Sequence, residues 1–408
     1  MSRNVAAPQG RILDLFAGAG GWDEGLGALG LRASGVEVDE LACLTATAAG
    51  HERIRADITQ LDPREFEGLW GLVGSPPCQA YSTSGNGLGR IDKPHVIACA
   101  HELAAGSDTR AERLRECRDA RSLLTVEPLR FALAIRPRWV ALEQVPGVIE
   151  LWSVFAELLA AAGYSATAGV LAGERYGLPQ ARKRAFLIAS LDGPVRLPEP
   201  KHRGYSLRRQ PVAEHERALE RCVSVARALG LDAQGELHTN NQTQSGRRPW
   251  GLCRSLSAPA YAMDTASHSW TLLSARAART SRGRRADCLA GRAAPVRREG
   301  RYVREGRALT LAQASVLQGF RCDYPWHGPR TRQFRQLGNA VPPPLARLVA
   351  EHAIRPGGSL AGSLAGSLAC SSCGSPRRVR GGSAMPHGSC GSGPRRNGEK
   401  SLSREVTS

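Results

Sequence analysis

A predicted strand, a glycine-rich turn and a predicted helix open the chain, and this order restricts the folds that it can adopt. The mostly apolar residues 11–16 predict a buried strand, and the glycine-rich turn 17–22 leads into a helix over 23–29. A nucleotide-binding βαβ unit begins in this way, because glycines let the main chain approach a ligand and a helix N-terminus favours an anionic group. Many glycine-rich turns bind nothing, so this feature alone predicts only a βαβ unit.

Acidic side chains stand at the ends of the next two predicted strands. Residues 33–39 form a short strand that reaches Glu37, about twenty residues after the turn, where a carboxylate can accept from ribose hydroxyls. Residues 54–58 predict a third strand tip, which carries Asp57. Acids are also common at strand ends for structural reasons. Together with the turn, however, they predict one ligand lying across the carboxyl edge of a parallel sheet.

A cysteine follows a fourth predicted strand on a stiff loop. The apolar run 69–73 precedes the loop 74–79, in which Pro76 and Pro77 come directly before Cys78. The two prolines fix φ and restrict the residues before them, so the thiol is held at the edge where open α/β sheets bind ligands. Such a tripeptide alone is more often a turn with an incidental cysteine. The other motifs of the chain favour a functional thiol.

Two further polar motifs lie beside later strands. The predicted strand 139–142 ends in Glu143, and a surface carboxylate is the alternative to a functional one. Arg182 and Arg184 alternate within an extended stretch, so we expect them to share one face.

The alternation of strands and helices stops between about residues 190 and 307. This segment is polar, and from 276 to 307 it is dense in arginine, so we expect a separate small domain with a basic face. A solvated arginine-rich linker is the alternative. Regular secondary structure is predicted again after this segment. We expect a helix over 309–320, capped by threonine and ended by glycine, and a last helix over 345–354.

Charge and composition favour a nucleic-acid partner in a reducing compartment. The 408-residue chain has a formal charge of +18, which indicates a polyanionic partner, although an arginine-rich coding bias would also produce it. The eleven cysteines show no disulfide framework, and neither a signal core nor a membrane-spanning apolar run is present. We therefore expect a cytoplasmic protein.

The last fifty or so residues differ from the rest of the chain in composition. Beyond Arg355 the chain consists of Gly-Ser-Leu-Ala repeats and Gly/Ser/Arg sequence, which predicts disorder. Cys370 and Cys373 form one isolated Cys-x-x-Cys, and without further ligands at suitable spacing we expect no metal site.

Taken in order, the motifs resemble those of the DNA (cytosine-5)-methyltransferases. The similar segments are 14–21 (the cofactor loop), 76–79 (the nucleophile loop), 143–145, where Gln144 replaces the usual asparagine, 180–184, 309–320 and 336–342. The resemblance implies an α/β fold, a Rossmann-like S-adenosylmethionine-dependent methyltransferase sheet with a smaller, irregular target-recognition domain. The catalytic domain would comprise 1–189 plus 307–355, with an insertion at about 90–130. The recognition domain would be 190–306, and 356–408 would be the disordered tail.

The resemblance also implies a role for each motif. Cys78 would add to C6 of cytosine, helped by a nearby cation that lowers its pKa. Glu143 would hold N3 and the exocyclic amine, while Arg182 and Arg184 would bind the O2 side. Since Gln144 keeps an amide, we expect activity to survive that replacement. Substrate contacts would come from Gln79 and from the mobile stretch 80–90, including Ser82. S-adenosylmethionine would be bound by Phe16, Gly18, Gly20, Glu37, Asp57, Pro77, Asn339 and Val341.

The leading hypothesis is a monomeric, sequence-specific methylase of double-stranded DNA that flips its target cytosine and is associated with the nucleoid. A cognate restriction endonuclease would be a functional partner. A tRNA cytosine-5 methyltransferase and a catalytically inactive DNA-binding relative are the alternatives. A nicotinamide oxidoreductase would not need the Pro-Pro-Cys loop.

Overall fold

The computed structural model describes residues 10–82, 87–205, 213–238 and 307–356, together with short stretches between 253 and 303. The tail from residue 357 onward and most of the arginine-rich segment lie outside these residues, so both expectations stay predictions. Within the part of the chain that the structure describes, no helix is long and apolar enough to cross a membrane.

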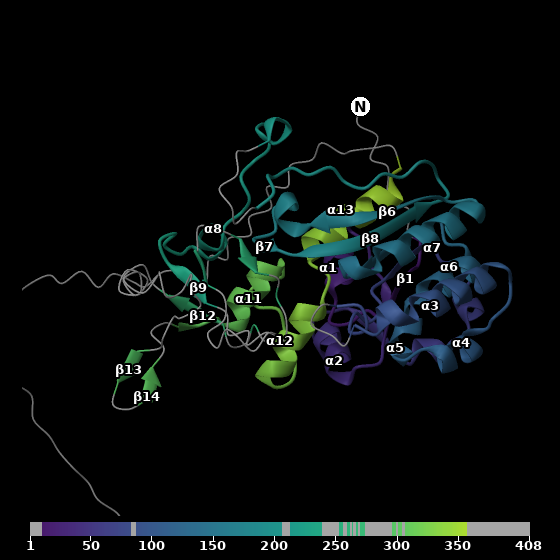
Figure 1. Ribbon diagram of the computed structural model, residues 1–408, viewed down its shortest axis with the longest axis horizontal. Helices are drawn as coiled ribbons and strands as arrows, with labels where there is room; N and C mark the ends of the chain where they lie inside the picture. Colours follow the sequence, from purple (N-terminus) through teal and green to yellow (C-terminus); the bar gives the residue numbers. More distant parts are fainter. Residues whose placement is uncertain are drawn as a thin grey trace, which may run out of the picture. The chain divides into compact units, whose positions relative to one another are not determined.

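A seven-stranded sheet organises the fold (Figure 1). Its strands lie in the order β3 (Glu52–Arg55), β2 (Ser34–Glu37), β1 (Ile12–Leu15), β4 (Gly71–Gly74), β5 (Trp139–Gln144), β8 (Lys183–Ser190) and β6 (Ser165–Ala172). The first five strands run parallel, whereas β8 runs antiparallel to both β5 and β6. The predicted Rossmann-like α/β fold class is therefore confirmed.

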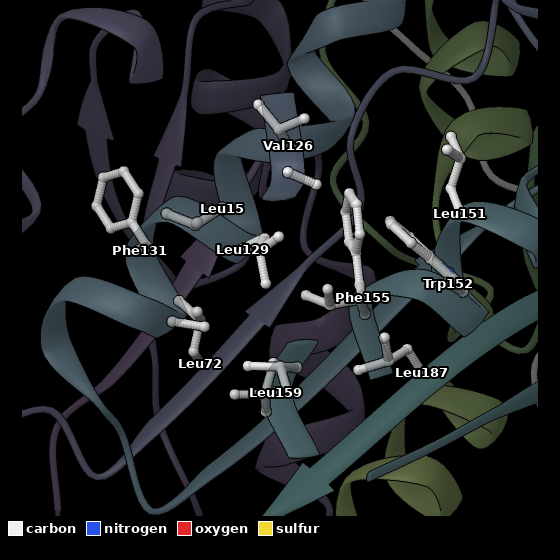
Figure 2. Close-up of a cluster of buried hydrophobic side chains, with 14 of the residues drawn as sticks. Leu15, Leu72, Val126, Leu129, Phe131, Leu151, Trp152, Phe155, Leu159 and Leu187 are labelled. Carbon is white, nitrogen blue, oxygen red and sulfur yellow. The ribbon is translucent and has the colours of Figure 1, made fainter. Parts of the chain in front are cut away.

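Helices cover both faces of this sheet, which explains why its central strands are continuously apolar. On one face, Leu15, Leu72 and Leu187 pack with side chains of α6 (Glu127–Ile135) and α7 (Ile149–Ala161), as Figure 2 shows. On the other face, a second cluster combines strand residues with α1 (Gly21–Gly27) and α13 (Pro343–Ile354). The parallel strands consequently present their carboxyl ends at one shared edge.

The helix near the end of the described chain packs closely against the first helix. A Cβ on Gly25 of α1 would lie 2.6 Å from the Cβ of Ala346 and 2.6 Å from the main-chain nitrogen of Arg347, both in α13. Glycine is needed at this crossing because a larger residue would separate the two helices. The contact brings the segment before α13 to the turn that follows β1.

The interval between the loop 74–79 and α6 contains the helices α3 (Gly89–Ala104), α4 (Arg110–Glu116) and α5 (Ala120–Leu123). The buried carboxylate of Asp92 in α3 accepts hydrogen bonds from the main-chain nitrogens of Arg118 and Asp119 and from the Ser122 hydroxyl. These bonds tie α3 to the start of α5. They make the interval an ordered part of the fold.

The expectation that the whole stretch 80–90 would be mobile is wrong at both of its ends. Ala80 and Tyr81 are buried, and the Tyr81 hydroxyl donates to the carbonyl of Ser122. Gly89 begins α3 directly against the Tyr81 ring, where a Cβ would lie 2.7 Å from the ring. Residues 83–86 lie outside the described residues.

The described residues of the segment after β8 include short strands and the short helix α8 (Val225–Leu229). A four-stranded sheet has the order β10 (Cys253–Ser255), β9 (Glu236–His238), β12 (Thr271–Leu273) and β15 (Arg307–Ala308). Two strand pairs join β11 (Ala260–Tyr261) to β7 (Gln180–Ala181) and β13 (Val296–Arg298) to β14 (Arg301–Val303).

Apolar side chains connect this segment with the helices that follow it. Leu237 and Trp270 are buried with residues of α11 (Leu311–Gln318) and α12 (Arg330–Asn339). As predicted, the Thr310 side chain caps α11 and Gly319, at φ +92°, ends it.

Replacing Gly25 by alanine tests the helix crossing. We expect Gly25→Ala to lower the free energy of unfolding by about 1–3 kcal/mol, because the added methyl overpacks the contact with α13. The matched control is Gly27→Ala in the same helix, where an added Cβ would meet nothing within 4 Å. That variant should be neutral or slightly stabilising in urea unfolding. Equal effects of the two substitutions would contradict the proposed close contact.

Candidate active site

A cavity of about 450 Å³ opens at the carboxyl edge of the sheet. It gathers most of the residues that the sequence singled out: Phe16, Gly18, Glu37, Asp57, Pro77, Cys78, Gln79, Glu143, Arg184, Asn339 and Val341. Gly20, Ser82 and Arg182 do not line it. The tertiary structure therefore joins the two predicted groups, the ligand-binding edge and the thiol, in one site.

The turn after β1 has an unusual main-chain conformation at one end of the cavity. Phe16 has φ +59° and Gly18 has φ +53°. A bulky residue rarely adopts the left-handed region, and such strain is concentrated at functional sites. The Glu37 carboxylate accepts from the main-chain nitrogens of Gly18, Val38 and Asp39, each at 2.8 Å. It thereby fastens the turn to the start of α2 (Glu40–Ala48).

An apolar surface and a second carboxylate lie beside this turn. Val38 lines the cavity with 64% of its surface exposed, although it is a large aliphatic residue. Oδ1 of Asp57 accepts from the nitrogen and the hydroxyl of Thr59, at 3.0 and 2.8 Å. Our sequence interpretation did not include Val38, because nothing in an alternating strand distinguishes a ligand-covered position from an ordinary exposed one.

The end of α12 closes the opposite side of the cavity. Asn339 and Val341 line it, and Gly21 lies against the main chain of Val341, where a Cβ would be 2.9 Å from the nitrogen. Arg332 and Arg335, exposed residues of α12, also line the cavity and were not predicted. Gly20 was expected to contact the ligand, but it does not line the cavity. A Cβ at Gly20 would lie 2.6 Å from the Tyr324 hydroxyl and 2.7 Å from Cδ2 of His51, so Gly20 packs against these two side chains.

Gln144 holds the loop that carries the cysteine. Its amide nitrogen donates to the carbonyls of Pro76 and Pro77, at 3.1 and 2.7 Å, and its oxygen accepts from the nitrogen of Val145 at 2.6 Å. Proline has no N–H with which to fasten such a loop, so the contacts come from its carbonyls. From the sequence we expected only that an amide at this position is tolerated.

The thiol of Cys78 lies beside an ion pair. Nε of Arg184 is 2.9 Å from Oε1 of Glu143, and the side chains of both residues are largely buried. Burial raises the pKa of Cys78; Arg184 acts to lower it and Glu143 to raise it, and the pKa remains above its ordinary value. Arg184 therefore acts on this pKa in the expected direction, but it does not bring the pKa below its ordinary value. Burial and the carboxylate outweigh Arg184, which is already paired with Glu143.

Arg182, unlike Arg184, does not line the cavity, although its charge also acts to lower the pKa of Cys78. The extended stretch is interrupted there, because the nitrogen of Arg182 donates to the carbonyl of Gln180 in a tight turn between β7 and β8. The buried guanidinium donates to the carbonyls of Gly338 and Met263, at 2.8 and 3.1 Å. Arg182 thus links the segment after β8 to the end of α12.

The nitrogen of the half-buried Ser82 donates to the carbonyl of Cys78, so Ser82 belongs to the turn after the nucleophile. Among the described residues, no group of three histidine, cysteine, aspartate or glutamate side chains is arranged to hold a metal ion.

Alkylation of Cys78 as a function of pH tests the electrostatics of the thiol. We expect Glu143→Gln to shift the midpoint of iodoacetamide alkylation to lower pH, because it removes the carboxylate that raises the Cys78 pKa. Arg184→Gln should shift the midpoint to higher pH. The rates are measured by mass spectrometry of the Cys78 peptide, and an unchanged midpoint in both variants would contradict the assignment.

Substitution of Gln144 tests the anchoring of the loop. Gln144→Leu removes both hydrogen bonds to the proline carbonyls, so we expect alkylation of Cys78 to become about tenfold faster as the loop opens more often. The neighbouring half-buried Cys117 provides an internal reference in the same sample. If Cys78 and Cys117 keep the wild-type ratio of rates, Gln144 does not hold the loop.

Comparison with known proteins identifies the family of this chain. The family model described as C-5 cytosine-specific DNA methylase matches residues 10–355. The type II methyltransferase M.DdeI of Desulfomicrobium norvegicum is 25% identical over 401 residues, covering 83% of this chain and 87% of its own length. The type II methyltransferase M.NgoMIV of Neisseria gonorrhoeae is 25% identical over 359 residues, covering 84% and 96%.

Among solved structures, the S. pombe Dnmt2 methyltransferase is similar in fold, with a TM-score of 0.53 and 15% sequence identity. The similarity covers 85% of this chain and 98% of that one. With a family match that spans residues 10–355, and with the motifs in the predicted order, the chain belongs to the C-5 cytosine-specific DNA methylases.

Proposed function

We propose that this protein is a DNA (cytosine-5-)-methyltransferase that transfers a methyl group from S-adenosylmethionine to C5 of a flipped-out cytosine in a specific duplex sequence. The observation that carries the proposal is the single cavity that holds Cys78, Glu143 and Arg184 beside Phe16, Glu37 and Asp57. The relatives named above are type II methyltransferases, which supports a DNA substrate and a cognate restriction endonuclease as functional partner.

The cavity has the volume and chemistry that an adenosine-containing cofactor requires. Phe16 and the exposed Val38 offer apolar contact to adenine, Asp57 can accept from its amine, and Glu37 from the ribose hydroxyls. Gly18 leaves room for a ligand, since a Cβ there would meet nothing within 4 Å. Pro77, Asn339 and Val341 would complete the pocket. When bound, S-adenosylmethionine supplies an electrophilic methyl group.

The residues at the other end of the cavity suit covalent catalysis. C5 of cytosine is a poor nucleophile, and addition of the Cys78 thiolate to C6 makes C5 enamine-like. After C5 has been methylated, loss of its proton and expulsion of the thiolate restore the aromatic ring. Glu143 holds N3 and the exocyclic amine, and Arg184 holds the O2 side. Arg182 does not contact the base in this proposal and instead fixes the end of α12.

Binding of the base would also activate the thiol. In the ligand-free protein burial and Glu143 keep the pKa of Cys78 high. A cytosine that engages Glu143 through N3 and the amine offsets the effect of that carboxylate and leaves Arg184 closer to the developing anion. Binding of the base would thereby lower the pKa of Cys78 and favour the thiolate.

A duplex substrate requires the cytosine to leave the base stack before Cys78 can reach it. The net charge of +18 favours binding to the phosphate backbone, and the segment 190–306 is proposed to read the recognition sequence. A monomer at the nucleoid suffices for this activity.

Expression in a host without cytosine methylation tests the proposal. We expect bisulfite sequencing to show protected cytosines in one short sequence context, and Cys78→Ala to abolish the protection because no adduct can form. The variant should still bind S-adenosylhomocysteine, which separates a catalytic defect from misfolding. Protection by Cys78→Ala would contradict the covalent mechanism.

Unprotected DNA with folded wild-type protein would contradict the DNA substrate. Cysteine-dependent methylation of transfer RNA in the same cells would then assign the activity to RNA. Absence of both activities would favour a DNA-binding relative without catalysis.

A further inference from the structure

A buried arginine lies beneath the proposed cofactor turn, and neither the family motifs nor the mechanism above uses it. Arg53 belongs to β3, the strand at the edge of the sheet. We infer that Arg53 is a positioning residue for S-adenosylmethionine, because it holds the Gly18 peptide in the conformation that faces the cavity. This inference rests on the proposed cofactor and extends the proposed function to a residue that never touches the ligand.

The side chain of Arg53 reaches across the neighbouring strand. Nη2 lies 2.6 Å from Oδ2 of Asp23 in α1, and Nε donates to the carbonyl of Gly18 at 3.3 Å. The side chains of Arg53 and Asp23 are only 2% and 3% exposed. One guanidinium therefore joins the edge strand, the cofactor turn and the first helix.

Gly35 of β2 makes this path possible. It is paired with Arg53 in the sheet, and a Cβ on Gly35 would lie 2.5 Å from Nη1 of Arg53 and 2.6 Å from the Cβ of Ala17. Any larger residue would displace either the guanidinium or the turn above it. The absence of a side chain at Gly35 thus leaves the space that the long side chain of Arg53 occupies.

Charged groups hold the two peptide groups that flank the Cα of Gly18. The N–H of Gly18 donates to Glu37 and its carbonyl accepts from Arg53. Since Gly18 has φ +53° and a Cβ there would meet nothing within 4 Å, its orientation is not maintained by packing of a side chain. Arg53 and Glu37, the proposed ribose ligand, thus hold the same residue from its two neighbouring peptide groups.

A different result is expected if the Arg53–Asp23 ion pair serves only the stability of the fold. A buried pair that serves only the fold can be replaced by apolar residues of similar volume with little loss of stability and no other effect. If Arg53 positions the turn, the same replacement keeps the fold but weakens cofactor binding. The two cases differ in ligand affinity, which can be measured without turnover.

The test is calorimetric titration of the full-length protein with S-adenosylhomocysteine. We expect the double variant Arg53→Met/Asp23→Met to melt near the wild-type temperature and to bind about tenfold more weakly, because the charge-assisted contact to Gly18 is lost. Its affinity for DNA should stay within about twofold, and its turnover should recover at saturating S-adenosylmethionine, so KM rises more than kcat falls.

Arg53→Lys keeps the charge and serves if the double variant fails to fold. An ammonium lacks the planar fork that serves Asp23 and Gly18 together, so we expect binding several-fold weaker than wild type. Arg55→Met is the matched control, since Arg55 lies on the same strand and forms an exposed ion pair with Glu40. It should bind as the wild type does.

Wild-type affinity for S-adenosylhomocysteine in a folded Arg53 variant would overturn the inference while leaving the proposed function intact. Equal weakening in Arg55→Met would overturn it as well, because the effect would not be specific to the buried side chain. If the wild-type protein does not bind S-adenosylhomocysteine, the proposed cofactor is wrong and the role of Arg53 falls with it.

Discussion

The close packing of α13 on α1 is the contact on which the site depends. Gly25 lets the two helices approach, and Gly21 lets the main chain of Val341 lie against the first turn of α1. These contacts carry Asn339 and Val341 from the far end of the matched region to the carboxyl edge of the sheet. Without them the cavity would lack one wall.

The loop that carries Cys78 is held in place by hydrogen bonds, but the surroundings of the thiol do not lower its pKa below the ordinary value. Gln144 fixes the proline carbonyls, and the Glu143–Arg184 pair lies beside the thiol. Burial nevertheless keeps the pKa of Cys78 above its ordinary value. A raised pKa makes this thiol less reactive towards oxidants and alkylating agents, since the thiolate is the reactive form.

The cofactor end shows the same use of buried charge for positioning. Glu37 and Arg53 hold the two peptide groups that flank Gly18, and Asp23 pairs with the arginine. Beneath them Asp14 is fully buried, and burial together with Asp23 raises its pKa well above the usual range. Such an arrangement orients the turn at some cost in folding free energy, because charges and carboxyl groups leave water.

The sequence by itself determined the fold class, the order of the motifs and several of the cavity-lining residues. Apolar strands that end in an acid or lead into a cysteine loop place those residues at one sheet edge by local geometry. This reasoning found Glu37, Asp57, Cys78 and Glu143, whereas Phe16 came from the family resemblance. Only the tertiary structure showed that Arg182 and Gly20 do not line the cavity. It also decided the Cys78 pKa and the path of Arg53 across Gly35. Burial and contacts between distant segments set these properties, and a local sequence pattern carries no information about either.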